Sequence, residues 1–212
     1  GNYNTALGTD SLTALTTASE NTAIGYQSLK ANTTGTQNIA VGSQTLKTNT
    51  TGSYNIAIGQ QALEDNTTGA SNVAVGHDVL RESNASNNTA IGFQAMVANT
   101  TGTENVAVGS NAFDANTTGN NGIAVGHQAL SANTTAHYNS ALGAYALKVS
   151  TTGASNTGVG AYALTANTTG TQNTAVGAFA LDAITTGSDN TAVGHNALTA
   201  NTASDNTAVG KG

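Results

Sequence analysis

Apolar and polar residues recur along this chain with a period of 17. A five-residue phrase, Asn-Thr-Ala-Val-Gly or a close variant, occurs thirteen times, and its closing glycines are Gly8, Gly25, Gly42, Gly59, Gly76, Gly92, Gly109, Gly126, Gly143, Gly160, Gly177, Gly194 and Gly210. Ten of the twelve intervals between them are 17 residues and two are 16. Since a fixed period is typical of a solenoid, in which each repeat contacts its neighbours, the pattern predicts a single repeat domain over residues 1–212.

Each repeat is predicted to contain two short strands. Positions are numbered from the Asn of the phrase, so that residues 55–71 occupy positions one to seventeen. Position four is aliphatic in every copy and position two is mostly Thr, Ile or Val, as on one face of a strand. Leu dominates position nine and charges gather at position ten, which predicts a second strand with position nine facing inward. The expected fold is all-β, a parallel β-solenoid or β-roll of about twelve 17-residue coils, with like positions stacked about 4.8 Å apart.

Position three is Ala in twelve of thirteen copies and Gly158 in the other. Neighbouring side chains on a strand point to opposite faces, so we expect position four to face the core and position three to face away from it. A position open to water should vary, so a constant Ala predicts close packing against identical chains in a side-by-side homotrimer. The alanines assigned to this inter-chain packing are Ala23, Ala40, Ala57, Ala74, Ala107, Ala124, Ala175 and Ala192.

Position twelve is usually Asn and has two interpretations. The side chains can stack as an internal ladder that bonds the turn backbone of adjacent coils. The same residues begin Asn-x-Thr, the acceptor pattern for glycosylation, at Asn32, Asn49, Asn66, Asn99, Asn116, Asn133 and Asn167. Leu15 and Ile184 occupy this position in two other copies, and an aliphatic replacement favours the inward ladder.

Composition narrows the classes of partner. Charged residues are 8% of the chain, the net charge is -6, and the five basic residues are scattered, so nucleic acid is not expected to bind. No apolar run approaches the roughly 20 residues needed to span a bilayer, so we expect no membrane insertion by this segment. The chain has no Cys, which excludes disulfides. No constellation of catalytic or metal-ligating residues is found, so no enzymatic activity, metal or cofactor is expected.

One local feature departs from the repeat. Tyr145, Tyr162 and Phe179 occupy position seven in three successive copies, where most earlier copies have Gln or Asn. Stacked about 4.8 Å apart, these rings are expected to form an aromatic stripe. The stripe is interpreted either as a surface that binds a partner or glycan, or as packing at an interface between chains.

The repeat resembles known fibre proteins. The stretches Asn-Thr-Ala-Ile-Gly-Tyr-Gln-Ser-Leu at 21–29 and Asn-Thr-Ala-Val-Gly-His-Asn-Ala-Leu at 190–198 are similar to the head repeats of trimeric autotransporter adhesins and to tail-fibre-type repeat proteins of bacteria and their phages. This resemblance covers essentially the whole chain. It implies a left-handed β-roll of three chains side by side, an extracellular location on a cell surface or virion fibre, and a role in surface attachment.

The leading hypothesis is therefore a non-enzymatic structural and adhesive fibre module. Its expected partners are copies of itself and a host surface receptor or glycan. Because the sequence starts and stops within a repeat, we expect a fragment of a longer fibre or a subunit that stacks end to end. The alternatives are a self-polymerising extracellular filament subunit and an ice-binding β-solenoid, the latter suggested by the repeated Thr at positions thirteen and fourteen.

Overall fold

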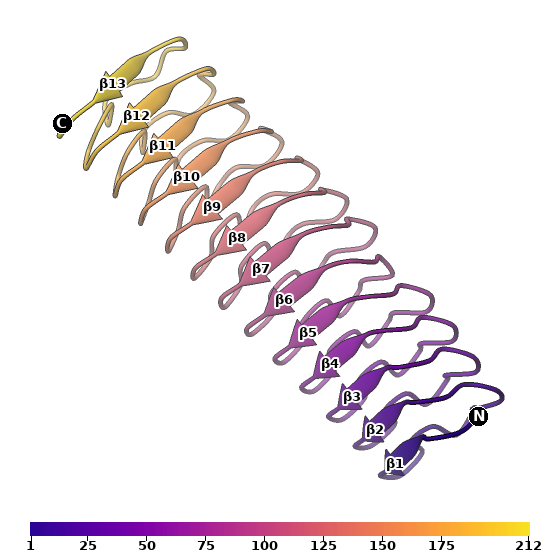
Figure 1. Cartoon of the computed structure of the whole chain (residues 1–212). Coiled ribbons are helices and arrows are strands. Elements are labelled where there is room, and N and C mark those ends of the chain that lie inside the picture. The colour runs from indigo at the N-terminus through magenta and orange to yellow at the C-terminus, as the bar shows by residue number, and fades with distance from the viewer. The chain divides into compact units, whose positions relative to one another are not determined.

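The computed structural model describes all 212 residues and contains one three-residue strand in each repeat, at positions two to four (Figure 1). The strands are β1 (Thr5–Leu7), β2 (Thr22–Ile24), β3 (Ile39–Val41), β4 (Ile56–Ile58), β5 (Val73–Val75), β6 (Thr89–Ile91), β7 (Val106–Val108), β8 (Ile123–Val125), β9 (Ser140–Leu142), β10 (Thr157–Val159), β11 (Thr174–Val176), β12 (Thr191–Val193) and β13 (Thr207–Val209). The expected all-β parallel β-solenoid is confirmed.

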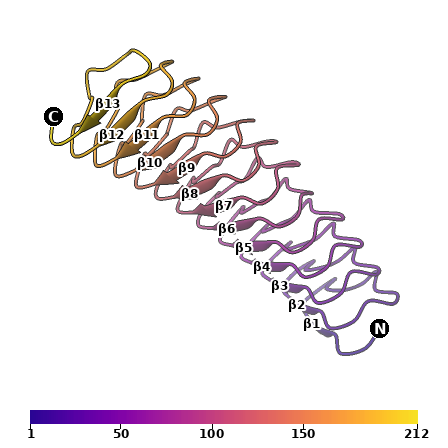
Figure 2. The ribbon, with the colours of Figure 1, turned by 45° about the horizontal axis from the view of Figure 1, so that its top comes forward.

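The chain divides into two compact units. The first unit, Gly1–Asn105, contains β1 to β6, and the second, Val106–Gly212, contains β7 to β13. Within each unit every strand pairs in parallel with the next, and like positions meet, as Ala57 meets Ala74. Within each unit, Figure 2 shows a returning loop connecting each strand to the next. The single repeat domain over residues 1–212 stays a prediction.

The second strand expected in each coil does not form. Positions seven and nine have positive φ angles, 58° at Gln44 and 49° at Leu46, while Thr45 between them does not. Such alternation folds the backbone into turns rather than an extended strand. The backbone N–H of Gln44 donates to Tyr26 in the preceding coil (2.7 Å), and that of Leu46 donates to Ala62 in the following coil (3.0 Å). Hydrogen bonds to both neighbours thus hold a conformation that costs a non-glycine residue about 1–2 kcal/mol.

The face of the strand that points into the coil is the opposite of the one expected. From β2 to β12, position three points into the coil and is buried, whereas positions two and four point outward, with Ile58 40% exposed. The coil interior is narrow: Leu at position nine, a small residue at position eight and Asn at positions one and twelve already fill it, as Leu63, Ala62, Asn55 and Asn66 do in one repeat. Only a small side chain fits on the inner face of the strand, which is why Ala is constant there.

The predicted inter-chain packing through alanine is therefore wrong. Each of these side chains is fully buried within its own chain and offers no surface to another copy. The residues concerned are Ala23, Ala40, Ala57, Ala74, Ala107, Ala124, Ala175 and Ala192.

The Asn at position one forms a second ladder, which was not expected from the sequence. The backbone N–H of Asn55 donates to Oδ1 of Asn38 in the preceding coil (3.0 Å), and Nδ2 of Asn55 donates to the same oxygen (3.1 Å) and to the Gly69 carbonyl (2.9 Å). The pattern repeats through most coils, at Asn21, Asn38, Asn72 and Asn190 among others. One buried side chain therefore satisfies backbone groups that the short strand leaves unpaired.

The inward ladder predicted at position twelve is confirmed. Asn49 Nδ2 donates to Asn32 Oδ1 (3.0 Å) and to the Gly52 carbonyl (3.0 Å), and Asn66 repeats the contact with Asn49 (2.8 Å). The glycosylation interpretation is wrong because these side chains are fully buried and closed to a glycan-transferring enzyme. They are Asn32, Asn49, Asn66, Asn99, Asn116, Asn133 and Asn167.

One coil of the first unit is a residue shorter, and a side chain replaces the missing carbonyl. In a full-length coil the carbonyl of Thr67 accepts hydrogen bonds from the backbone N–H groups of Thr50 (2.8 Å) and Thr51 (3.2 Å). In the shorter coil, Oδ1 of Asn84 takes this role and accepts from the backbone of Thr67 (3.0 Å) and Thr68 (2.8 Å). The amide oxygen of Asn84 thus restores the hydrogen bonds between the two coils.

We predict that Asn84→Ala lowers the free energy of unfolding by roughly 1–2 kcal/mol, because the backbone N–H groups of Thr67, Thr68 and Gly69 lose their acceptor. Urea denaturation followed by circular dichroism measures the change. Asn84→Asp, which keeps an acceptor oxygen in the same place, should lose much less. Equal losses in the two variants would contradict the role given to Oδ1.

We also predict that Gly158→Ala stabilises the second unit by about 0.5–1 kcal/mol, because it restricts the unfolded chain and completes the column of alanines. A Cβ built there lies 3.3 Å from the Ala163 carbonyl oxygen and 3.4 Å from Leu147 Cγ, an environment that accepts Ala in neighbouring coils. As a control, Gly160→Ala should be strongly destabilising, because its φ is 134° and its Cβ would lie 2.5 Å from Gly177. Thermal unfolding distinguishes the two, and a lower midpoint for Gly158→Ala would refute the prediction.

Candidate functional site

The most extensive surface feature is the outer face of the strands, formed by the side chains at positions two and four. In the first unit it consists of Thr5, Leu7, Thr22, Ile24, Ile39, Val41, Ile56, Ile58, Val73, Val75, Thr89 and Ile91. In the second unit it consists of Val106, Val108, Ile123, Val125, Ser140, Leu142, Thr157, Val159, Thr174, Val176, Thr191, Val193, Thr207 and Val209. No residue of either set carries a charge. Below, this set of side chains is called the outer face.

The outer face is uncharged and accessible to solvent; position four is aliphatic in every strand, whereas position two is Ile or Val in five strands and Thr or Ser in eight. Ile123 is 45% exposed, and most of the position-four side chains are comparably accessible, as at Ile24, Ile91 and Val176. Because the strands pair in parallel with like positions adjacent, these side chains form two continuous columns along each unit. Extended exposed apolar patches on soluble proteins mark sites of interaction. β-Branched side chains also have few rotamers, so such a surface loses little conformational entropy when it is covered.

The aromatic stripe predicted at position seven is present in the second unit. The rings of Tyr145 and Tyr162 are stacked with centroids 4.9 Å apart, and those of Tyr162 and Phe179 are stacked 5.1 Å apart with an interplanar angle of 3°. The backbone N–H of each residue donates to the preceding coil, as Tyr162 does to Ala144 (3.0 Å), so the stacking follows from the repeat. We call Tyr145, Tyr162 and Phe179 the aromatic ladder.

A histidine contacts the ring at each end of the aromatic ladder. His127 meets Tyr145 edge-on at 5.2 Å, and His195 meets Phe179 edge-on at 6.2 Å. Lys148 Nζ lies 5.1 Å from the centroid of the Tyr145 ring, at cation–π distance. Tyr162, the central ring, is stacked between Tyr145 and Phe179, so both of its faces are covered. A sugar cannot stack on the face of this ring, and the arrangement therefore favours packing against an apolar partner over glycan binding.

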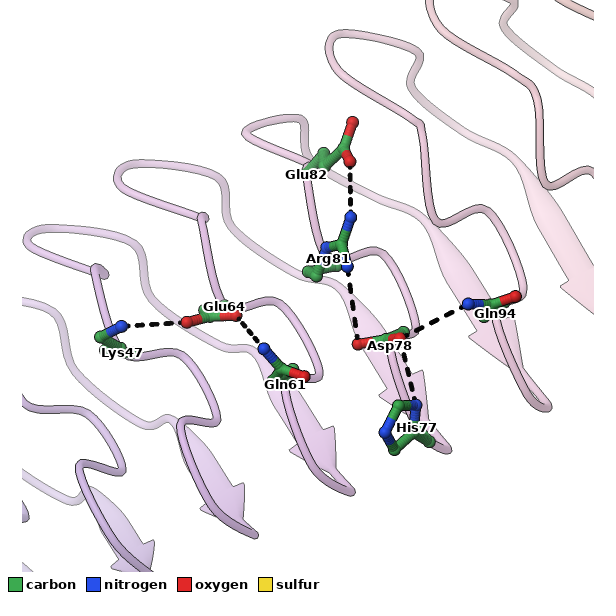
Figure 3. Close-up of polar contacts among 8 residues, drawn as sticks. All are labelled: Lys47, Gln61, Glu64, His77, Asp78, Arg81, Glu82 and Gln94. Carbon is green, nitrogen blue, oxygen red and sulfur yellow. Dashed lines mark hydrogen bonds and ion pairs between the residues drawn. The ribbon is translucent and has the colours of Figure 1, made fainter.

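Charged side chains in the first unit form a network between coils (Figure 3). Asp78 lies 3.1 Å from His77 Nδ1 and 3.9 Å from Arg81, and it accepts a long hydrogen bond from Gln94 (3.5 Å). Arg81 also pairs with Glu82 at 2.8 Å. These carboxylates have cationic or amide partners on their own or the next coil. The network therefore links adjacent coils, and none of its carboxylates faces a site where a substrate could bind.

An ion pair and a hydrogen bond to Glu64 lie one coil earlier. Lys47 pairs with Glu64 at 3.0 Å, and Gln61 donates to the other carboxylate oxygen of Glu64 at 2.8 Å. Asp65 follows Glu64 in the chain. Burial raises the pKa of the Asp65 carboxyl, and the neighbouring charge of Glu64 raises it further. In the second unit, burial also raises the pKa of Asp114, although hydrogen bonds from its own backbone, Asn111 and Ala115 oppose the shift.

No pocket is found, and no group of three or more His, Cys, Asp or Glu side chains is placed to hold a metal. The structure has no helix with the length and apolar character that a membrane crossing requires. Comparisons with protein-family models, curated proteins and solved structures find no match to this chain. The outer face and the aromatic ladder are therefore the two surface features from which a function can be inferred.

We predict that Tyr162→Leu lowers the free energy of unfolding by about 1–3 kcal/mol, because it removes two stacked pairs worth about 0.5–1.5 kcal/mol each. Denaturant unfolding measures the loss. Tyr138→Leu is the matched control, since this ring is largely exposed and its one aromatic neighbour, His137, is tilted at 6.2 Å. Similar losses for the two variants would show that the aromatic ladder adds nothing beyond ordinary packing.

Proposed function

We propose that this chain is a non-enzymatic structural fibre module that associates side by side with copies of itself through the outer face, and that it is displayed on a cell or virion surface for attachment. The observation that carries this proposal is the outer face: two continuous columns of uncharged, mostly β-branched side chains, exposed in both units. The homotrimer expected from the sequence is retained, with its interface moved from position three to positions two and four.

The chemistry of the outer face supports contact with an identical surface. Burying a fully exposed aliphatic side chain contributes roughly 1.5–3 kcal/mol, and the outer face offers half-exposed ones in every coil, for example Ile56 and Ile58 in β4. The two columns have the same spacing in every copy of the chain, so the ridges of one copy can match the grooves of another. The charged position ten lies in the returning loop and not in the strand, as Glu64 and Asp114 do, so no like charges meet across the outer face.

Fibre proteins with a surface role also need strong cohesion between successive coils, and the repeat provides it. Each coil is tied to its neighbours by the Asn ladders, by backbone hydrogen bonds and, in the first unit, by ion pairs such as that between Lys47 and Glu64. Attachment to a host surface receptor or glycan belongs to the same proposal. The aromatic ladder, whose Tyr145 and Phe179 follow Leu142 and Val176 of the outer face by three residues in sequence, is where we expect such a receptor or glycan to bind.

Ice binding is the second candidate, and one observation favours it. Several coils of the second unit place Thr at position two and Val at position four of the outer face, as in Thr174 and Val176. The hydroxyls of position thirteen, which first suggested this function, are instead donors to the next coil, as Thr50 Oγ1 is to the Thr67 carbonyl (3.0 Å). An ice-binding surface would therefore be the outer face. The self-polymerising filament stays a prediction.

We predict that the chain has a fixed solution mass of three copies over a range of concentrations in light scattering. The double variant Ile58→Lys with Ile123→Lys, one change on the outer face of each unit, should have the mass of one chain while keeping its circular dichroism spectrum. The variant should not associate, because association would bury unpaired ammonium groups of the two lysines, which costs free energy.

The matched control is Thr101→Lys with Thr118→Lys, which adds the same charge at two exposed positions of the loops. This variant should keep the mass of the unmodified chain. A monomeric unmodified chain would refute self-association, and inhibition of ice recrystallisation by that monomer would favour the second candidate.

A further inference from the structure

Two tyrosines of the aromatic ladder are held face to face in adjacent coils. The ring centroids of Tyr145 and Tyr162 are 4.9 Å apart with an interplanar angle of 24°. Both residues occupy position seven and share the same left-handed backbone, with φ of 61° and 60°. Identical backbone and like position bring corresponding ring atoms of the two phenols next to each other.

This arrangement is fixed before any reaction takes place. The N–H of Tyr145 donates to the His127 carbonyl (2.9 Å), and that of Tyr162 donates to the Ala144 carbonyl (3.0 Å). Phe179 also stacks on Tyr162, and Lys148 lies over the Tyr145 ring, so each tyrosine has a further contact that favours the stacked position. Tyr162 is nevertheless 38% exposed, and Tyr145 is half-buried, so a reagent in solution can reach the pair.

No other tyrosine has this neighbour. The chain has six tyrosines, and each of the other four lies next to a different residue type at the like position of the adjacent coils. Tyr54 is between Gln37 and Ser71, and Tyr138 is between Asn121 and Ser155. Tyr3 has Glu20 beside it, and Tyr26 has Thr9 and Ser43. Only Tyr145 and Tyr162 are therefore positioned to react with each other.

We propose that Tyr145 and Tyr162 are an oxidative cross-linking site, at which a one-electron oxidant, namely a haem peroxidase with hydrogen peroxide, joins the two rings as dityrosine. Each phenol loses one electron and its hydroxyl proton and becomes a tyrosyl radical. The two radicals form a carbon–carbon bond between the ring carbons next to the hydroxyls. Each of these carbons then passes its hydrogen to the phenolic oxygen, which restores both phenols. Overall, two tyrosines lose two hydrogen atoms, and one hydrogen peroxide becomes two water molecules.

The bond would join the coils of β9 and β10 covalently. The chain has no Cys, so it has no disulfide for this purpose, and its coils are otherwise joined only by the continuous backbone and by non-covalent contacts. Position seven is not part of the outer face, so a cross-link there changes no side chain of either column. Phe179, which has no hydroxyl, ends the reaction at one bond. This inference does not depend on the proposed function.

The tryptic peptides of this chain make the test direct. Cleavage after Arg81, Lys148 and Lys211 separates Tyr145, in residues 82–148, from Tyr162, in residues 149–211. The dilute protein is treated with horseradish peroxidase and hydrogen peroxide, run on a denaturing gel, digested and analysed by mass spectrometry. We expect a band at the mass of one chain that yields the two peptides joined, with a mass lower than their sum by two hydrogen atoms, and dityrosine fluorescence.

Two variants locate the bond. Tyr162→Phe keeps the stacked ring but lacks the hydroxyl, and it should give no joined peptides. Tyr138→Phe removes the other tyrosine of residues 82–148 and should give as much of the joined product as the unmodified chain. Free tyrosine added to a parallel mixture shows that the oxidant is active. The proposal is overturned if the active oxidant gives no joined peptides, if the product survives in Tyr162→Phe, or if it is found only between separate chains.

Discussion

The whole structure depends on the hydrogen bonds that buried Asn side chains make between neighbouring coils. A three-residue strand pairs few of its own backbone groups, and the rest of the coil is turn. At position one, Asn55 supplies its amide to the Gly69 carbonyl and to Asn38, while the Asn38 oxygen accepts the Asn55 backbone N–H. At position twelve, Asn49 does the same for Gly52. Without these side chains, a coil this small would bury several unpaired polar groups, each costing about 1–3 kcal/mol.

The narrow interior follows from that arrangement and decides what the surface looks like. With two Asn columns and one Leu column inside, the strand can place only Ala inward, and its aliphatic residue at position four, together with the Ile, Val, Thr or Ser at position two, must face outward. Gly52 shows how tight the interior is, since a Cβ there would lie 2.3 Å from the Gly69 carbonyl oxygen. The exposed apolar columns of the outer face are thus a consequence of how the coil is built. A chain with such a surface along each unit gains free energy when a second surface covers it, and this gain is the physical basis of the proposed association.

The repeat, the parallel register and the stacking of Tyr145, Tyr162 and Phe179 could be predicted from the sequence, because they depend only on period and on like positions meeting. Which face of the strand points into the coil could not be predicted. Alternation indicates that Ala57 and Ile58 lie on opposite faces but not which face is inside, and the ordinary preference for large aliphatic residues in a core gave the wrong answer. A signal was present in the size of the columns: a position that never exceeds Ala is confined, whereas one that accepts Ile, Leu and Val alike is not.

The second strand was predicted wrongly for a related reason. An inward Leu46 followed by a charged Lys47 looks like alternation, yet the left-handed backbone at Gln44 and Leu46 produces the same pattern through turns. Propensity does not indicate this conformation, since Leu has no preference for positive φ. The role of Asn38 was also missed, because an Asn that precedes a strand looks like an ordinary turn residue until the Asn columns of adjacent coils are brought together.

The left-handed residues also bear on how the chain acquires its structure. Each repeat holds three non-glycine residues at positive φ, as at Gln44, Leu46 and Tyr54, which together cost about 3–6 kcal/mol when nothing holds them. A lone coil has no neighbour to accept its N–H groups and so cannot maintain this shape. A coil already folded presents the carbonyl and Asn oxygens that the next one needs. Folded coils therefore act as nuclei, and folding propagates from them through each unit one repeat at a time.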